Sequence, residues 1–131
     1  MNPNEVVEAY FAAWDAHDGQ AVIDLYAEDG TYQDPATEGP LSGQAIGDYA
    51  EALFAAFPDL KLELISQADA SIGQIAVPWL LFGTHQGPLG EMEATGKSVA
   101  IRGCDYIVVE DGKLKAVYGT FSLQELMEQL S

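Results

Sequence analysis

The chain has 131 residues, of which 48% are hydrophobic and 10% aromatic, and this composition excludes a disordered or low-complexity protein. It carries 21 acidic and five basic residues, for a formal net charge of −16. Such a charge disfavours contact with phosphate backbones and anionic lipids, so we expect no nucleic acid and no membrane as partners. The acids are scattered, which indicates a solvated acidic surface or, alternatively, adaptation to high salt.

Signals for export, membrane insertion or cross-linking are missing from the sequence. No apolar run approaches the roughly 18 residues of a transmembrane helix, and the first residues lack the basic and apolar stretches of a secretory leader. The single cysteine, Cys104, can form neither an internal disulfide nor a multi-cysteine zinc site. We therefore expect one domain over residues 1–131, located in the cytoplasm.

The first predicted element is a helix. Asn2 can cap it, Pro3 suits its first position, and Glu5 completes a capping box. The apolar residues between Val6 and Trp14 then follow a helical stripe. We expect this helix to end near His17.

Two more helices and a short strand are predicted before residue 60. Asp18 can cap a second short helix that runs to Tyr26, and residues 31–33 are expected to form a short strand. After a loop rich in Pro and Gly, Ser42 can cap a third helix. Pro58 terminates that helix.

The second half of the chain changes from a helical period to a period of two. The strands that this alternation predicts cover residues 60–65, 72–84, 99–109 and 114–121. Pro78 predicts a bulge, residues 110–113 predict a tight hairpin, and Ser122 opens a capping box for a short terminal helix. The order predicts an α+β domain in which three N-terminal helices cover one face of a curved, mostly antiparallel sheet.

Five short segments, taken in order, are similar to those of a known family: Phe57-Pro58-Asp59-Leu60, Gly83-Thr84-His85-Gln86-Gly87, Ala94-Thr95-Gly96-Lys97, Arg102-Gly103-Cys104-Asp105 and Glu110-Asp111-Gly112-Lys113-Leu114. Together they resemble the SnoaL-like polyketide cyclase family of the nuclear transport factor 2-like superfamily, from about residue 3 to residue 130. The resemblance implies a cone-shaped fold around an internal hollow.

The resemblance also implies a reaction, from which this sequence departs at key positions. Cyclases of the family close a ring by a cofactor-free aldol reaction, in which an Asp of a His-Trp-Asp segment on the last strand removes a proton next to a carbonyl. That segment falls here on Val117-Tyr118-Gly119, where neither end can exchange a proton. A further histidine of the cyclases corresponds to Asp105. The family's reaction therefore does not carry over unchanged.

Asp105 is the first candidate for a catalytic residue. Side chains alternate along a strand, and the residues that share its face are all apolar: Val99, Ile101, Gly103, Ile107 and Val109. Removing a lone carboxylate from water raises its pKa, which suits a general base near neutrality. The alternative is a carboxylate that a tyrosine or a backbone donor holds for structural reasons.

Two further polar residues are candidates for the site. His85 ends the predicted central strand and can exchange a proton near pH 7, although anchoring of a loop is the alternative. Asp34 precedes Pro35 in a region that often reaches the pocket mouth in this superfamily, and an Asx turn is the alternative. The two histidines and the scattered acids lack metal-ligand spacing, so we expect no metal.

Aromatic residues on or near the sheet are candidates for substrate binding: Tyr32, Trp79, Phe82, Tyr118 and Phe121. Aromatic side chains pack in cores as well as in binding sites, but some of them must border any hollow. Tyr118 or Tyr32 could also donate a hydrogen bond to a carbonyl oxygen.

These residues and the resemblance predict an enzyme that performs cofactor-free acid–base chemistry on a small, largely apolar carbonyl compound in an internal pocket. The reaction types considered are aldol cyclisation, isomerisation and dehydration. Asp105 would be the base, and Tyr118, Tyr32 or His85 would polarise the carbonyl. The missing titratable groups at positions 117 and 119 favour the alternative, a non-catalytic small-molecule binder or a dimerisation scaffold.

The resemblance further implies a homodimer that forms through the outer face of the sheet. Alternation places Arg102, Cys104 and Tyr106 on that face, near the expected interface. The expected partners are therefore a small apolar molecule and a second copy of the chain, with no cofactor.

Overall fold

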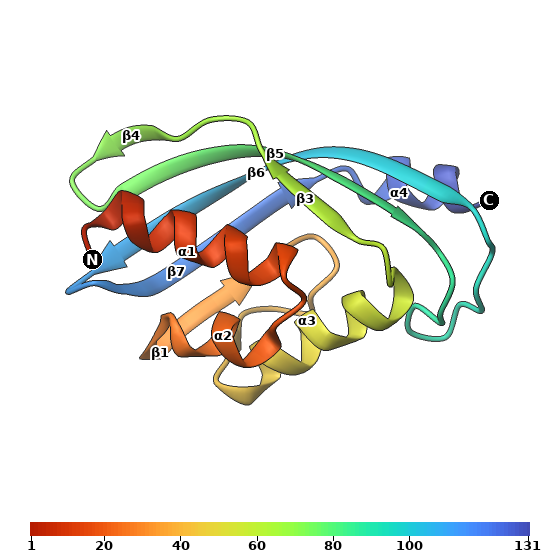
Figure 1. The fold of residues 1–131 in the computed structure, drawn as a ribbon, viewed down its shortest axis with the longest axis horizontal. Coiled ribbons are helices and arrows are strands. Elements are labelled where there is room, and N and C mark those ends of the chain that lie inside the picture. Colours follow the sequence, from red (N-terminus) through yellow and green to blue (C-terminus); the bar gives the residue numbers. More distant parts are fainter.

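The computed structural model describes residues 1–131 as four helices and one seven-stranded sheet (Figure 1). The helices are α1 (Pro3–Asp15), α2 (Gly19–Asp24), α3 (Gln44–Ala56) and α4 (Leu123–Leu130). The strands are β1 (Tyr26–Gln33), β2 (Leu41–Ser42), β3 (Lys61–Leu64), β4 (Ala68–Ser71), β5 (Gln74–Thr84), β6 (Ser98–Glu110) and β7 (Lys113–Phe121). None of the helices is long and apolar enough to cross a membrane.

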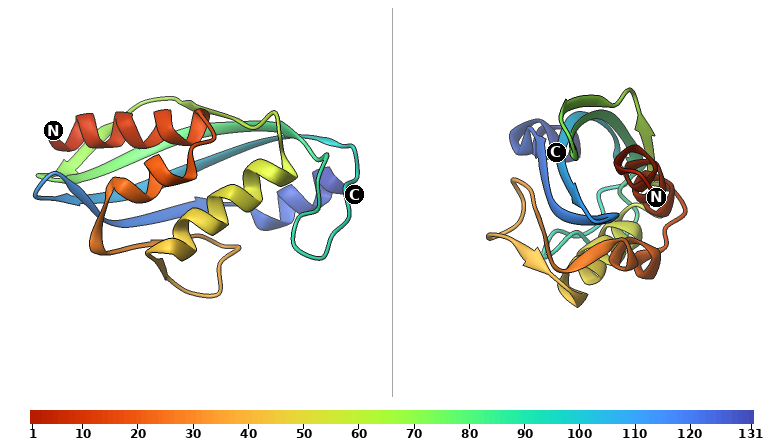
Figure 2. Two further views of the ribbon diagram at one scale, coloured as in Figure 1. Left: turned by 60° about the horizontal axis from the view of Figure 1, so that its bottom comes forward. Right: turned by 90° about the vertical axis from the view of Figure 1, so that its left-hand side faces the viewer.

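The long strands β5, β6 and β7 curve around the N-terminal helices, as the end-on view in Figure 2 shows. The sheet order is β2-β1-β7-β6-β5-β3, with β4 also paired to β5. Only the β1–β7 pair is parallel, and every other pair is antiparallel. The predicted α+β architecture, with three helices on one face of a curved, mostly antiparallel sheet, is confirmed.

The helix starts predicted from capping residues are correct at three of the four helices. Asn2 and Glu5 form the complete capping box of α1, and Pro3 is its first residue. The side chains of Asp18 and Ser122 accept hydrogen bonds from backbone N–H groups in the first turns of α2 and α4. These polar side chains satisfy donors that the helix itself leaves free.

Two predictions for the segment between α2 and α3 are wrong. Tyr26 begins β1 and does not end α2, because this segment pairs with β7 from residue 26 onward and the pairing overrides its local pattern. Ser42 pairs with Thr31 in the β1–β2 ladder, so it is a strand residue. The N-cap of α3 is Gly43, whose φ of 58° and ψ of −135° favour glycine.

The structure also corrects the prediction of strands before and within β5. Residues 68–71 form β4, which the sequence did not reveal because its side chains are exposed and polar or small. Pro78 causes no bulge, since the β5–β6 register is unbroken. Its carbonyl accepts a hydrogen bond from the Ile65 backbone at 2.9 Å, so its ring nitrogen faces the break between β3 and β4. No ladder donor is therefore lost there.

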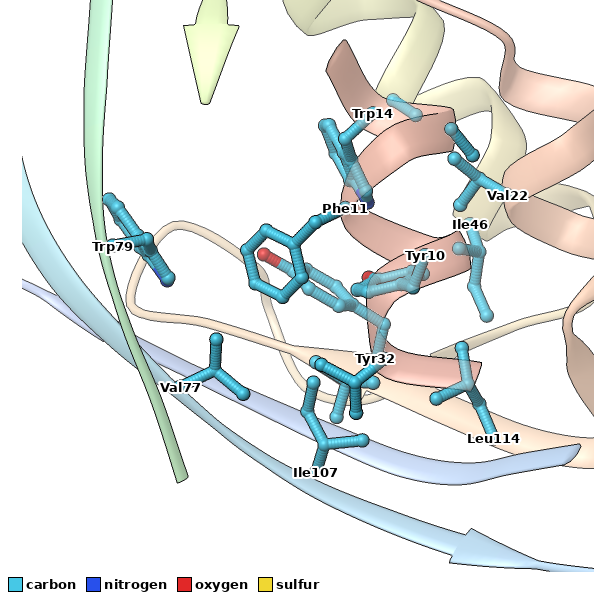
Figure 3. Close-up of a cluster of buried hydrophobic side chains, with 14 of the residues drawn as sticks. Tyr10, Phe11, Trp14, Val22, Tyr32, Ile46, Val77, Trp79, Ile107 and Leu114 are labelled. Carbon is cyan, nitrogen blue, oxygen red and sulfur yellow. The ribbon is translucent and has the colours of Figure 1, made fainter. Parts of the chain in front are cut away.

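The core fills the space between α1 and the concave face of the sheet. Tyr10, Phe11 and Trp14 point from α1 toward residues of the strands, including Val77 and Ile107 (Figure 3). The C-terminal helix α4 docks differently: the side-chain amide of Gln129 donates to and accepts from the backbone of Ala100 on β6. This contact replaces the strand partner that β6 lacks beyond the end of β7.

Candidate functional site

A cavity of about 420 Å³ lies on the concave face, beyond the part of the sheet that α1 covers. Of its 20 lining residues, 17 are hydrophobic, and the other three are Asp34, Gly90 and Asp105. Helices α3 and α4 and the segment between β5 and β6 contribute walls, through Leu53, Leu89 and Met127 among others. The volume lies in the range of small-molecule sites, which are mostly apolar with a few placed polar groups.

Asp105 faces this cavity from the middle of β6, where it stands opposite Val77 of β5 and Gly119 of β7. It is only 7% exposed. The indole Nε1 of Trp79 donates to its Oδ1 at 3.0 Å, and no protein group donates to its Oδ2. Burial raises the pKa of Asp105 to about 7; the Trp79 hydrogen bond opposes this rise and the nearby Asp34 charge adds to it. Asp105 thus lies on the concave face, as strand alternation predicted, and its role as a base stays a prediction.

Asp34 has a different environment, in which hydrogen-bond donors surround the carboxylate. Its Oδ2 accepts from the hydroxyls of Tyr32 and Tyr49, each at 2.6 Å. Its Oδ1 accepts from the backbone N–H of Ala36 at 2.7 Å, which is the Asx turn expected as an alternative. Burial, and then neighbouring carboxylates, raise the pKa values of both tyrosines, so both hydroxyls keep their protons and donate.

The glycine at position 119 allows these groups to converge. A Cβ at Gly119 would lie 3.1 Å from Oδ1 of Asp105, 3.2 Å from Cβ of Asp34 and 3.3 Å from the hydroxyl of Tyr32. Position 119, where the resemblance implies the catalytic Asp of the cyclases, therefore has no side chain in this protein. Two carboxylates from other elements surround it.

Of the five aromatic residues predicted to bind substrate, three line the cavity and two do not. Tyr32, Trp79 and Phe121 border it. Phe82 and Tyr118 lie on the outer face, where they are 38% and 42% exposed. The prediction was wrong for these two because alternation along β5 and β7 turns them away from Trp79 and Gly119.

His85 is fully buried and does not line the cavity. Its Nδ1 accepts a hydrogen bond from the backbone N–H of Thr95 at 3.2 Å and contacts the Thr95 hydroxyl at 3.0 Å. Backbone hydrogen bonds from His85 N–H to Lys97 and from Gly96 N–H to His85 close the same loop. This geometry corresponds to the loop-anchoring alternative, and it takes His85 out of the candidate site.

The sequence pattern does not identify Tyr49 as a site residue, because its spacing from Ile46 and Leu53 is that of the apolar face of a helix. A tyrosine hydroxyl on a buried helix face needs a polar partner. This requirement could have indicated from the sequence that Tyr49 contacts a polar residue. No three His, Cys, Asp or Glu side chains lie close enough together to hold a metal ion.

Comparison with solved structures identifies many proteins of the same fold. A candidate SnoaL-like polyketide cyclase from Jannaschia sp. CCS1 has a TM-score of 0.88 at 16% identity, over 98% of this chain and 91% of that chain. AclR, a candidate hydroxylase from Streptomyces galilaeus, has a TM-score of 0.84 at 23% identity, over 98% and 94%. A protein of ketosteroid isomerase-like fold from Catenulispora acidiphila DSM 44928, solved with trimethylamine, has a TM-score of 0.82 at 20% identity, over 98% and 93%.

At these identities the structural likeness establishes the fold, and the sequence establishes the family. No curated protein matches the chain. The model of the family described as SnoaL-like polyketide cyclase matches residues 4–130, which is nearly the whole chain. The chain therefore belongs to the SnoaL-like polyketide cyclase family.

Proposed function

We propose that the protein is an enzyme that moves a proton on a small, largely apolar carbonyl compound, with Asp105 as the general base and without a cofactor. The observation that carries the proposal is a buried carboxylate that faces an apolar cavity and has one oxygen free of protein donors. Its pKa of about 7 suits a base, because a base near the working pH is both available and strong enough to accept a proton.

The geometry supports a definite division of roles. Trp79 holds Oδ1 of Asp105, which leaves Oδ2 for the proton next to the substrate carbonyl. The C–H bond breaks, its electron pair forms the enolate, and Asp105 becomes neutral. Tyr32, which lines the cavity and whose hydroxyl lies beside position 119 as Asp105 Oδ1 does, is the candidate donor to the enolate oxygen. Its hydroxyl would turn from Asp34, which Tyr49 and the Ala36 N–H continue to hold.

Within acid–base chemistry, this arrangement favours isomerisation over aldol closure. One carboxyl group can remove a proton and return it to another carbon of the same substrate. An aldol closure also has to stabilise and protonate an alkoxide at a second carbonyl, and the positions where the resemblance places the cyclases' titratable groups are Val117 and Gly119 here.

The main test measures deuterium uptake next to the carbonyl of a panel of small apolar ketones in D₂O by NMR. Asp105→Asn keeps the shape of the side chain and removes the base, so exchange should fall by about 10²–10⁴-fold. Tyr118→Phe, on the outer face, is the matched control and should leave the rate unchanged. Equal rates for Asp105→Asn and the wild type would exclude Asp105 as the base.

The second candidate is a non-catalytic binder of a small apolar molecule. The absence of a titratable side chain at positions 117 and 119 favours it. Saturable binding of a ketone without deuterium uptake would support this candidate over the enzyme.

A homodimer through the outer sheet face stays part of the proposal. Partly exposed aromatic residues on that face, Phe82 and Tyr118, support it. Light scattering at micromolar concentration should give twice the chain mass, and Tyr118→Glu should lower that value to one chain. The cytoplasm is the compartment that we propose, and cell fractionation would test it.

A further inference from the structure

The cavity has an unusual balance of charge for a site with mostly apolar walls. It contains two carboxylates, Asp34 and Asp105, and no lysine, arginine or histidine. The chain as a whole has a net charge of −16. An anionic ligand would meet uncompensated negative charge in a region of low dielectric, where such repulsion is strong. The site therefore disfavours anions.

The two carboxylates differ in the number of hydrogen bonds that they accept from the protein. Asp34 accepts three hydrogen bonds from the protein, from Tyr32, Tyr49 and the Ala36 backbone. Asp105 accepts one, on Oδ1, although it is only 7% exposed. A buried ionised oxygen without a partner is unfavourable unless a donor or a cation approaches it. Oδ2 of Asp105 is thus an acceptor that the protein leaves for a ligand.

Besides the free carboxylate oxygen of Asp105, the cavity has aromatic rings in its walls, which also favour a cation. Six of the lining residues are aromatic: Trp14, Tyr32, Tyr49, Phe57, Trp79 and Phe121. The rings of Trp79 and Phe121 have centroids 6.4 Å apart and are inclined at 55°, next to the carboxylate that Trp79 holds. The faces of such rings attract organic cations, most strongly where water is excluded.

From these observations we propose that the cavity binds small hydrophobic ammonium ions, with the charged nitrogen beside Asp105 and its alkyl groups against the aromatic walls. The inference uses the cavity alone and does not depend on catalysis. A bound ammonium ion would neutralise Asp105 and fill apolar space at the same time, which neither an anion nor a neutral hydrocarbon can do.

The charge state of Asp105 gives the proposal a pH signature. The titratable groups that face Asp105 are Asp34 and Tyr32 from the β1 side, Tyr10 from α1, and Tyr26. Burial moves the pKa values of the three tyrosines upward, further from neutrality, whereas the pKa of Asp105 lies at about 7. An ammonium ion prefers the ionised carboxylate, so its affinity should rise with pH through this region.

The experiment compares benzyltrimethylammonium, whose charge is permanent, with neopentylbenzene, a neutral molecule of the same shape. Binding is measured by ligand-observed NMR at about pH 6 and pH 8. We expect the cation to bind at least tenfold more tightly than the isostere at pH 8. Its affinity should fall roughly tenfold at pH 6, because most Asp105 is then protonated. The isostere should show no such fall.

Variants separate this site from general attraction to an acidic protein. Asp105→Asn should remove the cation preference and its pH dependence while the isostere still binds. Tyr118→Phe, on the outer face, should change neither. Equal affinity for the two probes at pH 8, or a cation preference that persists in Asp105→Asn, would overturn the proposal. Deuterium uptake by ketones would be unaffected by that result, so the proposed function would be judged separately.

Discussion

Side chains alternate in the same way along both halves of the concave face, but one half is covered by α1 and the other borders the cavity. We call them the filled half and the hollow half. Toward the N-terminal end, α1 lies on the sheet, and Val6, Val7 and Tyr10 are fully or almost fully buried against it. Toward the other end, Ile101 and Trp79 face the cavity, with α4 and the segment after β5 as its walls. Alternation therefore produces a core where α1 covers the strands, and a cavity where no element fills the space.

The polar groups of the two halves also differ, in how completely the protein satisfies their hydrogen bonds. In the filled half, the hydroxyls of Tyr10 and Tyr26 bond to each other at 2.8 Å and satisfy one another. In the hollow half, Asp105 has a single protein donor and a free oxygen. A complete network stabilises a core, whereas an incomplete one is available to a ligand.

The largest effect should follow from removing bulk in the filled half. Ile107 is fully buried, so Ile107→Ala should lower the free energy of unfolding by about 2–5 kcal/mol. Ile101→Ala, which enlarges a cavity that already exists, should cost clearly less. Urea unfolding with unchanged m-values would measure both. Equal losses would show that the two halves are packed alike.

Asp105→Asn should change the pH dependence of stability. The pKa of Asp105 is raised to about 7 in the folded state, so the folded protein holds this proton more tightly than the unfolded chain does. The contribution of Asp105 to stability is therefore greatest at low pH and falls between its unfolded pKa near 4 and its folded pKa, by up to about 4 kcal/mol.

The Asn variant lacks this titration, so its melting temperature should exceed that of the wild type at about pH 8 and approach it at about pH 5. Thermal unfolding across this range is the measurement. A wild-type advantage at pH 8 would show that Asp105 is stabilised as an anion, contrary to its position in the hollow half.

Gly103→Ala tests the packing behind the site. A Cβ there would lie 2.3 Å from the Trp79 ring and 2.7 Å from the Thr120 carbonyl. The clash should cost about 1–3 kcal/mol and move the indole away from Asp105. Trp79→Phe gives the Cβ room, so the double variant should lose less stability than the two single losses added together. Additive losses would mean that Trp79 does not confine position 103.

Added salt should have the smallest effect, and it should act on both halves alike. The chain has one ion pair, between Lys115 and Asp29, against 21 acidic residues. Salt between 0.01 and 0.15 M shortens the screening length from about 30 Å to about 8 Å, so the melting temperature should rise modestly. Ile107→Ala and Asp105→Asn should show the same rise. A flat or falling profile would mean that the acids are spaced widely enough not to repel.

The sequence by itself determined the elements whose signals are local. Asn2 and Ser122 mark helix starts because a cap satisfies neighbouring backbone donors. The Asp111-Gly112 turn of the β6–β7 hairpin was predicted because both residues accept positive φ, 52° and 73°. The isolation of Asp105 on an apolar face was equally readable, since alternation along one strand needs no partner.

Only the tertiary structure decided which parts of that apolar face are filled and which are hollow. Tyr49 became a site residue because α3 brings its hydroxyl to Asp34, 15 positions away in sequence. Phe82 and Tyr118 point away from Trp79 and Gly119 by alternation along their own strands, and the tertiary structure decided which of the two faces borders the cavity. Local pattern fixes the direction in which a side chain points along its own strand. What it meets there depends on packing between distant elements, and this packing separates a core from a cavity.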